Sequence, residues 1–337
     1  MSTIALSQTS ILSDYKSLAY QMAYKQSSSS SYQGPLTLNT KTGMGEPKDI
    51  SGITKIYPTK DRGREWFMNM NYPKDSPNFF ITDNPNLSKL SDRSWRINAS
   101  HVRMVVNTSE NQNNWKDVEI TGYVRLHYLN DSQKVSISNT SDLVNSIRSS
   151  TPDDEEIDDL VFISRSGRHS SELPCEGTAY NGVLHTDASL GWKKEIWHTG
   201  GYTDERARHI AAEPILGKWV GWKIVVYNIE FENKTTAVKL ESYLDESNTN
   251  NWTKVTELID GGGWYSNTNN SMFFSAGRDK FKDHILAGAG PLIIFRTDNL
   301  VLDFKHLSIR EIQPPYPFQH NLTTVLNLTN HKSSLSK

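Results

Sequence analysis

The stretch Val118-Glu-Ile-Thr-Gly-Tyr-Val-Arg-Leu-His-Tyr128 alternates between apolar and polar side chains along most of its length. Successive side chains of a β-strand point to opposite faces, so this period of two predicts a strand with one face in the core. The apolar face holds Val118, Ile120, Val124, Leu126 and Tyr128. The other face holds Glu119, Thr121, Tyr123, Arg125 and His127, and we expect it to be an open polar surface.

Similar strand-like segments follow one another through most of the chain. Residues 238–245 alternate in the same way, and residues 219–229 are continuously apolar, as in a central strand. Residues 291–296 and 300–312 predict two more strands, the second of which closes the fold. Clusters of Gly, Asn, Asp, Ser and Pro separate these segments, and helical periodicity is weak. The sequence therefore predicts an all-β fold, a two-sheet antiparallel β-sandwich, because a propeller would show a repeat of roughly 40–50 residues.

Three regions follow from composition. Residues 27–31 are a run of serines, typical of a linker, so residues 1–34 are expected to form a flexible N-terminal segment. The sandwich is expected to occupy residues 35–312. The run Pro314-Pro-Tyr-Pro317 ends the strand ladder because proline has no amide hydrogen, which leaves residues 313–337 as a polar C-terminal tail.

Charge and apolar content exclude two classes of protein. The chain has 337 residues, with 36 Lys and Arg against 38 Asp and Glu, and a formal net charge of −2. This balance excludes a nucleic-acid-binding protein that relies on a broad basic field. No stretch approaches the ~18–20 apolar residues of a transmembrane helix.

Cys175 is the only cysteine, so an intrachain disulfide is impossible.

The number of Asn-x-Ser/Thr sequons predicts an extracellular or cell-surface glycoprotein. Residues 1–25 do not support this location directly, because they lack the basic and continuous apolar regions of a secretory signal peptide. The sequons begin at Asn86, Asn98, Asn107, Asn130, Asn139, Asn233, Asn251, Asn269, Asn321 and Asn327.

Between Val161 and Tyr202 the sequence collects residue types suited to binding a polyanion and moving protons. A lyase that cleaves an acidic glycan by β-elimination needs a cation against the uronate carboxylate, a base for the C5 proton and an acid for the leaving oxygen. We therefore predict catalytic roles for Arg165, His169, Tyr180 and Glu195. We predict substrate-binding roles for Arg125, His127, Arg168, Lys194, Trp197 and Tyr202.

Strand parity suggests that these residues share one sheet face. If neighbouring strands pair in the assumed order, a single groove holds Arg125, His127, Arg165, His169, Tyr180, Lys194 and Glu195. Three alternatives remain open. The charged residues are the solvent side of a sheet; or Glu176 and Glu195 are the carboxyl pair of a glycosidase; or the protein is a non-catalytic carbohydrate-binding or adhesive protein that self-associates through its N-terminal segment by strand addition.

Metal and cofactor signals are weak. No His-Glu-x-x-His motif is present, and we expect the reaction to require no cofactor. A structural calcium ion, held by loop carbonyls and an aspartate such as Asp303, remains an option.

The closing segment Arg296-Thr-Asp-Asn-Leu-Val-Leu-Asp-Phe-Lys-His-Leu-Ser-Ile-Arg310-Glu-Ile resembles the last strand of concanavalin A-like jelly rolls. These include laminarinase-type glucanases, alginate-lyase-like enzymes and 3-keto-disaccharide hydrolases. The segment Val238-Lys-Leu-Glu-Ser-Tyr-Leu-Asp245, followed by a turn and Trp252, is similar to their back-sheet strand. The resemblance implies a jelly roll with a carbohydrate-facing concave sheet. The laminarinase signature Glu-x-Asp-x-x-Glu is absent, so no catalytic residue is carried over from the family.

Overall fold

The computed structural model describes residues 47–82, 85–108, 112–128, 159–167, 177–197, 201–231, 234–266 and 283–315. These residues form fifteen strands and one short 3-10 helix, η1 (Pro73–Asp75). No helix in this part of the chain has the length and apolarity to span a membrane. The strands are β1 (Glu65–Phe67), β2 (Phe79–Ile81), β3 (Leu87–Lys89), β4 (Trp95–Asn98), β5 (His101–Asn107), β6 (Val118–Tyr128), β7 (Asp159–Ser166), β8 (Ala179–His185), β9 (Ser189–Glu195), β10 (Arg206–Ile210), β11 (Val220–Glu230), β12 (Thr236–Asp245), β13 (Thr253–Asp260), β14 (Leu292–Asp298) and β15 (Leu300–Glu311).

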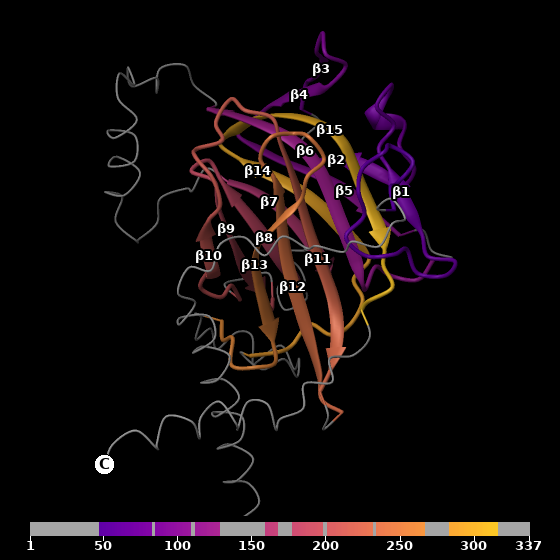
Figure 1. Cartoon of the computed structure of the whole chain (residues 1–337), viewed down its shortest axis with the longest axis vertical. Coiled ribbons are helices and arrows are strands. Elements are labelled where there is room, and N and C mark those ends of the chain that lie inside the picture. The colour runs from indigo at the N-terminus through magenta and orange to yellow at the C-terminus, as the bar shows by residue number, and fades with distance from the viewer. Residues whose placement is uncertain are drawn as a thin grey trace, which may run out of the picture.

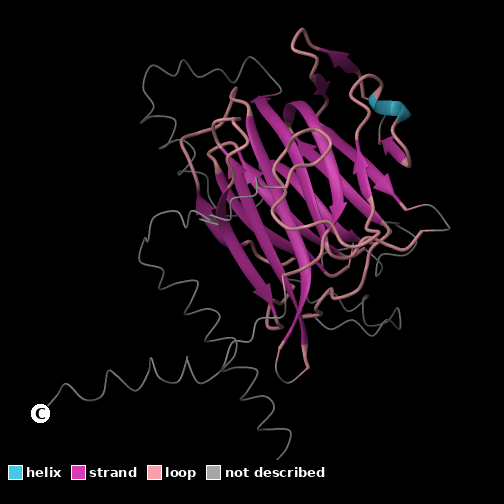
Figure 2. Ribbon diagram, turned by 45° about the vertical axis from the view of Figure 1, so that its right-hand side comes forward, coloured by secondary structure: helices cyan, strands magenta, loops and turns pink. Residues whose placement is uncertain are grey.

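The strands form two antiparallel sheets that pack face to face (Figure 1 and Figure 2). The eight-stranded sheet has the order β13-β12-β11-β6-β15-β4-β3, with β1 paired to β15, and the seven-stranded sheet has the order β10-β9-β8-β7-β14-β5-β2. The chain crosses repeatedly between the sheets, for example from β5 to β6 and from β14 to β15, as in a jelly roll. The predicted all-β, two-sheet antiparallel sandwich is confirmed.

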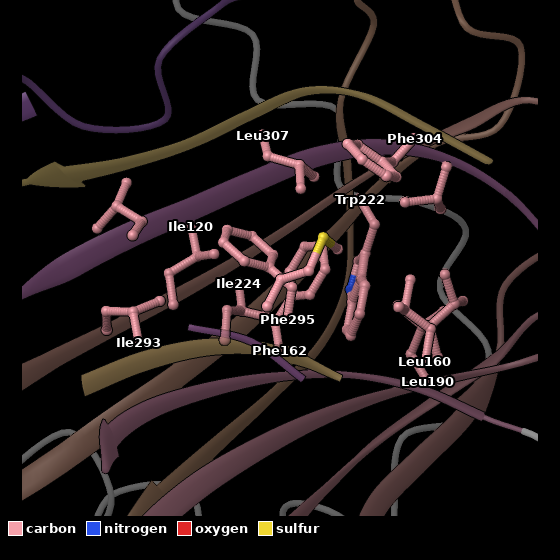
Figure 3. Close-up of a cluster of buried hydrophobic side chains, with 14 of the residues drawn as sticks. Ile120, Leu160, Phe162, Leu190, Trp222, Ile224, Ile293, Phe295, Phe304 and Leu307 are labelled. Atoms are coloured by element: carbon pink, nitrogen blue, oxygen red, sulfur yellow. The ribbon is translucent and has the colours of Figure 1, made fainter. Parts of the chain in front are cut away.

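Aromatic and branched aliphatic side chains fill the space between the sheets (Figure 3). Trp222 of β11 stacks on Phe162 of β7, with ring centroids 4.1 Å apart. Phe295 of β14 packs edge-on against the same Phe162 ring at 5.0 Å. The buried Trp222 indole donates its hydrogen bond to Ser242 Oγ at 2.9 Å. Three rings from both sheets therefore meet at the centre of the core.

The alternation predicted for residues 118–128 is confirmed, since β6 has these bounds and its apolar residues lie in the core. Its polar face, however, is not open: Glu119 and Thr121 are buried. Residues 47–60 cross this face, and the Ile56 amide donates to Glu119 Oε2 at 3.0 Å. Glu119 also pairs with Lys223 at 2.8 Å and with Arg310 at 2.6 Å. Burial of this face is tolerated because each charge has a partner.

Candidate functional site

The single groove predicted from strand parity is wrong, because its residues belong to two different sheets. Arg125 and His127 lie on β6 of the eight-stranded sheet. Arg165, Tyr180 and Lys194 lie on β7, β8 and β9 of the seven-stranded sheet. Parity determines which face of a strand a residue occupies but not which sheet the strand joins. Arg168, His169 and Glu176 lie outside the described residues.

Tyr180 and Lys194 point into the sandwich and not onto an outer surface. Tyr180 Oη donates to Asp260 Oδ2 at 2.6 Å, and Lys194 Nζ donates to the same oxygen at 2.9 Å. The side chains of Lys194 and Asp260 are fully buried. Burial, reinforced by the Asp260 carboxylate, raises the Tyr180 pKa well above its ordinary value. Since Asp260 ends β13 of the other sheet, this cluster links the two sheets and is not accessible to a polysaccharide.

Arg165 is turned inward by a bulge. The register between β7 and β14 shifts beside it, and its φ of 53° lies in the left-handed region. Its guanidinium donates to the Leu286 carbonyl at 2.7 Å, to the Lys116 carbonyl at 3.2 Å and to Asp117 Oδ1 at 3.2 Å. Arg165 therefore links the loop that holds Lys116 and Asp117 to the loop that holds Leu286, from inside the protein. Trp197 is also buried, so its ring has no open face for a sugar.

The two remaining predicted residues, Glu195 and Tyr202, lie on or beside the outer face of the seven-stranded sheet. Glu195 follows the core-facing Lys194 on β9, and an isolated bridge pairs Glu195 with Tyr202. Sequence reasoning missed most of the polar residues on this face. They come from β5, β14, β7 and β8, whose alternate residues face the core.

Two arginines stand side by side on this face. Arg296 of β14 lies directly opposite Arg103 of β5 in the strand register. Their strand neighbours Phe295 and Met104 point into the core, so both arginines point outward. Like charges directly opposite each other destabilise a sheet unless an anion lies nearby.

The available anions only partly neutralise the arginine pair. Arg296 Nε lies 2.7 Å from Asp298 Oδ2, and the same carboxylate contacts His101 Nδ1. No carboxylate within the described ranges forms an ion pair with Arg103. Arg103 therefore has no carboxylate partner among the described residues, while Arg296 is partly neutralised by Asp298.

The Tyr202 hydroxyl lies within the field of these arginines. Burial, together with the Glu195 carboxylate, raises the pKa of Tyr202, while Arg296 and Arg103 oppose that rise. The raised pKa keeps the phenol protonated at neutral pH, and the phenol hydrogen bonds to the Glu195 carboxylate. Half-buried Tyr202 thus lies close to the arginine pair as a hydrogen-bond donor.

A histidine and a carboxylate form the other end of this face. His185 of β8 places Nε2 at 3.1 Å from Glu205 Oε1 and 3.3 Å from Oε2. Burial acts to raise the Glu205 pKa, but the hydrogen bond from His185 and the charges of His185, Lys193 and Arg208 together outweigh it, so the pKa lies below its ordinary value. Glu205 is therefore a carboxylate at neutral pH and can only accept.

This contact determines the tautomer of His185. The Nε2 atom must carry the hydrogen that Glu205 accepts, so Nδ1 of the neutral ring carries the lone pair. In the described part of the chain, His185 Nδ1 is buried and has no hydrogen-bond partner, and the same holds for Asn181 Oδ1 on the same strand. Buried polar atoms are usually hydrogen-bonded to protein or water, so these two acceptors are available to a water molecule or a ligand.

Asp159 of β7 joins the two ends of the face. In the register it lies opposite His185 on one side and opposite Asp298 on the other. Burial raises its pKa, and Asp298 adds to the rise. We refer to the whole set as the outer-face cluster: Arg103, Arg296, Asp298, Asp159, His185, Glu205, Asn181, Glu195 and Tyr202.

Asp303, named above as a calcium ligand, has other partners. Its carboxylate pairs with Arg96 at 2.6 Å, Arg125 at 2.7 Å and His127 at 3.0 Å, so its charge is already neutralised. Across the residues that the structure describes, no group of three or more His, Cys, Asp or Glu could hold a metal ion. Structural calcium elsewhere in the chain stays a prediction.

No family model matches the sequence, and a search of curated proteins found no match. Solved structures of similar shape include a Bacillus subtilis protein of unknown function with a galectin-like fold (7% identity, TM-score 0.41, 75% of this chain and 100% of that one). The carbohydrate recognition domain of Emp47p is 8% identical, with a TM-score of 0.39 over 79% of this chain and 100% of that one. An alginate lyase from Aplysia kurodai is 9% identical, with a TM-score of 0.33 over 74% of this chain and 98% of that one. At these identities and TM-scores the similarities carry no argument about activity.

Proposed function

We propose that this protein is a polysaccharide lyase that cleaves a uronate-containing glycan by β-elimination at the outer-face cluster. The observation that carries the proposal is the cross-strand pair Arg103 and Arg296, with the protonated Tyr202 in its field and His185 on the same face. These are the three chemical parts that β-elimination needs.

The arginine pair supplies the binding energy for an acidic sugar. A uronate carboxylate between Arg103 and Arg296 relieves their mutual repulsion and accepts charge-assisted hydrogen bonds from both guanidinium groups. Neutralising the carboxylate also stabilises the negative charge that develops beside it when the C5 proton leaves. The substrate class is therefore a polyuronate and not a neutral glucan.

His185 is proposed as the base. This role requires Nδ1, which is buried in the structure, to become accessible when the glycan binds. The Nδ1 lone pair then takes the C5 proton, and the electrons of the C5–H bond form the C4=C5 double bond as the C4–O bond breaks. Tyr202 gives its proton to the departing oxygen and becomes a phenolate. Proton exchange with solvent then returns His185 and Tyr202 to their starting states. Glu205 stabilises the imidazolium that forms during this step.

Glycosylation and an extracellular location remain part of the proposal. The described sequon asparagines are Asn86, Asn98, Asn107 and Asn251, and all are exposed. Their exposure supports access for a glycosyltransferase. A location outside the cell also matches a polymeric substrate too large to enter one.

The test is incubation with alginate, polygalacturonate and hyaluronan, with laminarin as the neutral control. A lyase generates an unsaturated product that absorbs in the ultraviolet. Arg296→Gln, His185→Ala and Tyr202→Phe should each abolish most of this absorbance, whereas Tyr265→Phe, at an exposed tyrosine outside the cluster, should not. New reducing ends without unsaturation indicate a hydrolase, and binding without any product indicates a non-catalytic binding protein. Either result contradicts the proposal.

A further inference from the structure

A second polar surface lies on the opposite side of the sandwich, on the outer face of the eight-stranded sheet. The strands β4, β15 and β6 are adjacent in this sheet (Figure 1). Their register places Arg96, Asp303 and Arg125 directly opposite one another. Arg96 binds Asp303 with two nitrogens, Nε at 2.6 Å and Nη2 at 2.9 Å. Arg125 binds it through Nε at 2.8 Å and Nη2 at 2.7 Å.

The carboxylate is at the base of this arrangement and the cations are at its rim. The Asp303 side chain has no exposed surface, whereas 36% of the Arg96 side chain and 24% of the Arg125 side chain are exposed. His127 is 32% exposed, and its Nε2 lies 3.0 Å from Asp303. The arginines therefore present their outer edges to solvent while one buried carboxylate holds them in place.

Lys305 adds a cation that has no acidic partner within ion-pairing distance in the described part of the chain. Its ammonium lies 4.5 Å from the centroid of the Trp219 ring, and the Arg125 guanidinium lies 4.8 Å from the same ring. Burial lowers the Lys305 pKa, and Arg125 lowers it further, while Asp92 opposes both. The half-buried Trp219 thus holds two cations close together, where an anion would relieve their repulsion.

The charges do not cancel. The basic groups are Arg96, Arg125 and Lys305, while the nearby acids are Asp303 and the exposed Asp92 at the rim. With Lys305 protonated, three positive charges against two negative ones leave an excess of one. Asp92 is itself engaged by Ser94, which lowers its pKa through a side-chain hydrogen bond.

We infer that this surface, made of Arg96, Arg125, His127, Lys305 and Trp219, binds the carboxylate or sulfate group of an acidic glycan as a second site separate from the outer-face cluster. The planar guanidinium edges suit an oxyanion, and the Trp219 ring supplies apolar surface for the attached sugar. The hydrophobic core separates the two sites, so one short oligosaccharide cannot occupy both. The site anchors polymer and takes no part in bond cleavage.

Binding is best measured in full-length protein carrying Arg296→Gln, which weakens the outer-face cluster. The probes are a defined oligogalacturonate for the carboxylate, a heparin-derived oligosaccharide for the sulfate and maltohexaose as the neutral control, with calorimetry as the readout. We expect at least one acidic probe to bind, maltohexaose not to bind, and the added substitution Lys305→Gln to weaken the acidic probe about tenfold. Weakening of one probe or both supports the site and identifies its oxyanion.

A matched control removes one charge beside the far end of this sheet. Lys60 is exposed, and its amide bonds the Glu311 carbonyl at the far end of β15, so Lys60→Gln should leave binding unchanged. Equal binding of the acidic probes with and without Lys305→Gln overturns the inference, and so does absence of binding by both acidic probes. The anchoring site is tested separately from the lyase proposal, because Lys305→Gln alone should leave cleavage of short substrates unchanged. Loss of that cleavage in Lys305→Gln also contradicts a separate anchoring site.

Discussion

The carboxylate of Glu205 lies 3.1 Å from Nε2 of His185, in space that a side chain at Gly191 would fill. A Cβ placed on Gly191 would lie 2.0 Å from Glu205 Oε1, so the contact requires glycine on the neighbouring strand. This relationship gives His185 one defined tautomer and leaves Nδ1 as the proton acceptor.

Removing the negative charge of Glu205 should therefore slow catalysis without unfolding the protein. In Glu205→Gln the amide can donate as well as accept, so the His185 tautomer is no longer defined and its imidazolium loses its counter-charge. We expect kcat to fall about a hundredfold, with KM nearly unchanged. Glu213→Gln, at an exposed glutamate, is the control. An unchanged kcat would show that Glu205 does not act through His185.

Lys194 is expected to matter for stability and not for substrate binding. Its ammonium and the Asp260 carboxylate are both buried, so Lys194→Met leaves a buried negative charge whose hydrogen-bond partners, the Tyr180 hydroxyl and the Gly262 amide, are neutral. Breaking such a pair costs about 3–5 kcal/mol of unfolding free energy. Urea unfolding followed by tryptophan fluorescence measures the loss. The control is Lys60→Met, at an exposed lysine. If both variants lose the same unfolding free energy, Lys194 is not buried against Asp260.

Two neighbouring glycines should respond very differently to alanine. A Cβ on Gly290 would lie 2.3 Å from the carbonyl carbon of Arg165, and backbone cannot move aside as a flexible side chain can. We expect Gly290→Ala to cost about 2–3 kcal/mol or to prevent folding. A Cβ on Gly288 would have nothing within 4 Å, so Gly288→Ala is a matched control that should be close to neutral. Equal thermal midpoints for the two variants would contradict the bulge at Arg165.

Asp303 should make stability depend on pH in the acid range. Burial acts to raise its pKa, but hydrogen bonds from Arg96, Arg125 and His127 outweigh it and lower the pKa below its ordinary value. A carboxyl with a lowered folded pKa stabilises the protein fully above its unfolded pKa of about 3.9, and this stabilisation is lost as pH falls through the folded pKa. The stability difference between wild type and Asp303→Asn should therefore shrink below about pH 4. A difference that stays constant down to about pH 2 would refute these pairings.

The face of each strand could be predicted from sequence because it depends only on neighbouring residues. The alternation over Val118–Tyr128 identified the core side of β6, and the apolar run near Trp222 identified a central strand. Sheet membership depends on pairing between distant segments. Arg125 was therefore grouped with Lys194, although β6 and β9 lie in different sheets.

The outer-face cluster was harder to predict for the same reason. Arg103 and Arg296 are far apart in sequence and become neighbours only through the pairing of β5 with β14. The alternation of Asn181 and His185 over Ala179–His185 was a usable signal, but nothing local indicated Glu205 as the partner. Arg165 was misplaced because a bulge reverses the side on which it lies, and alternation alone does not reveal a bulge.

The most direct test of the central claim is the mass of the products formed from a defined oligouronate. β-Elimination breaks the C4–O bond without consuming water, so the masses of the two products should sum to the mass of the substrate. Hydrolysis would add one water to that sum. We predict no added water with the wild-type protein and the loss of most cleavage with Arg296→Gln. Products heavier by one water, or full cleavage by Arg296→Gln, would contradict a lyase that acts through the outer-face cluster.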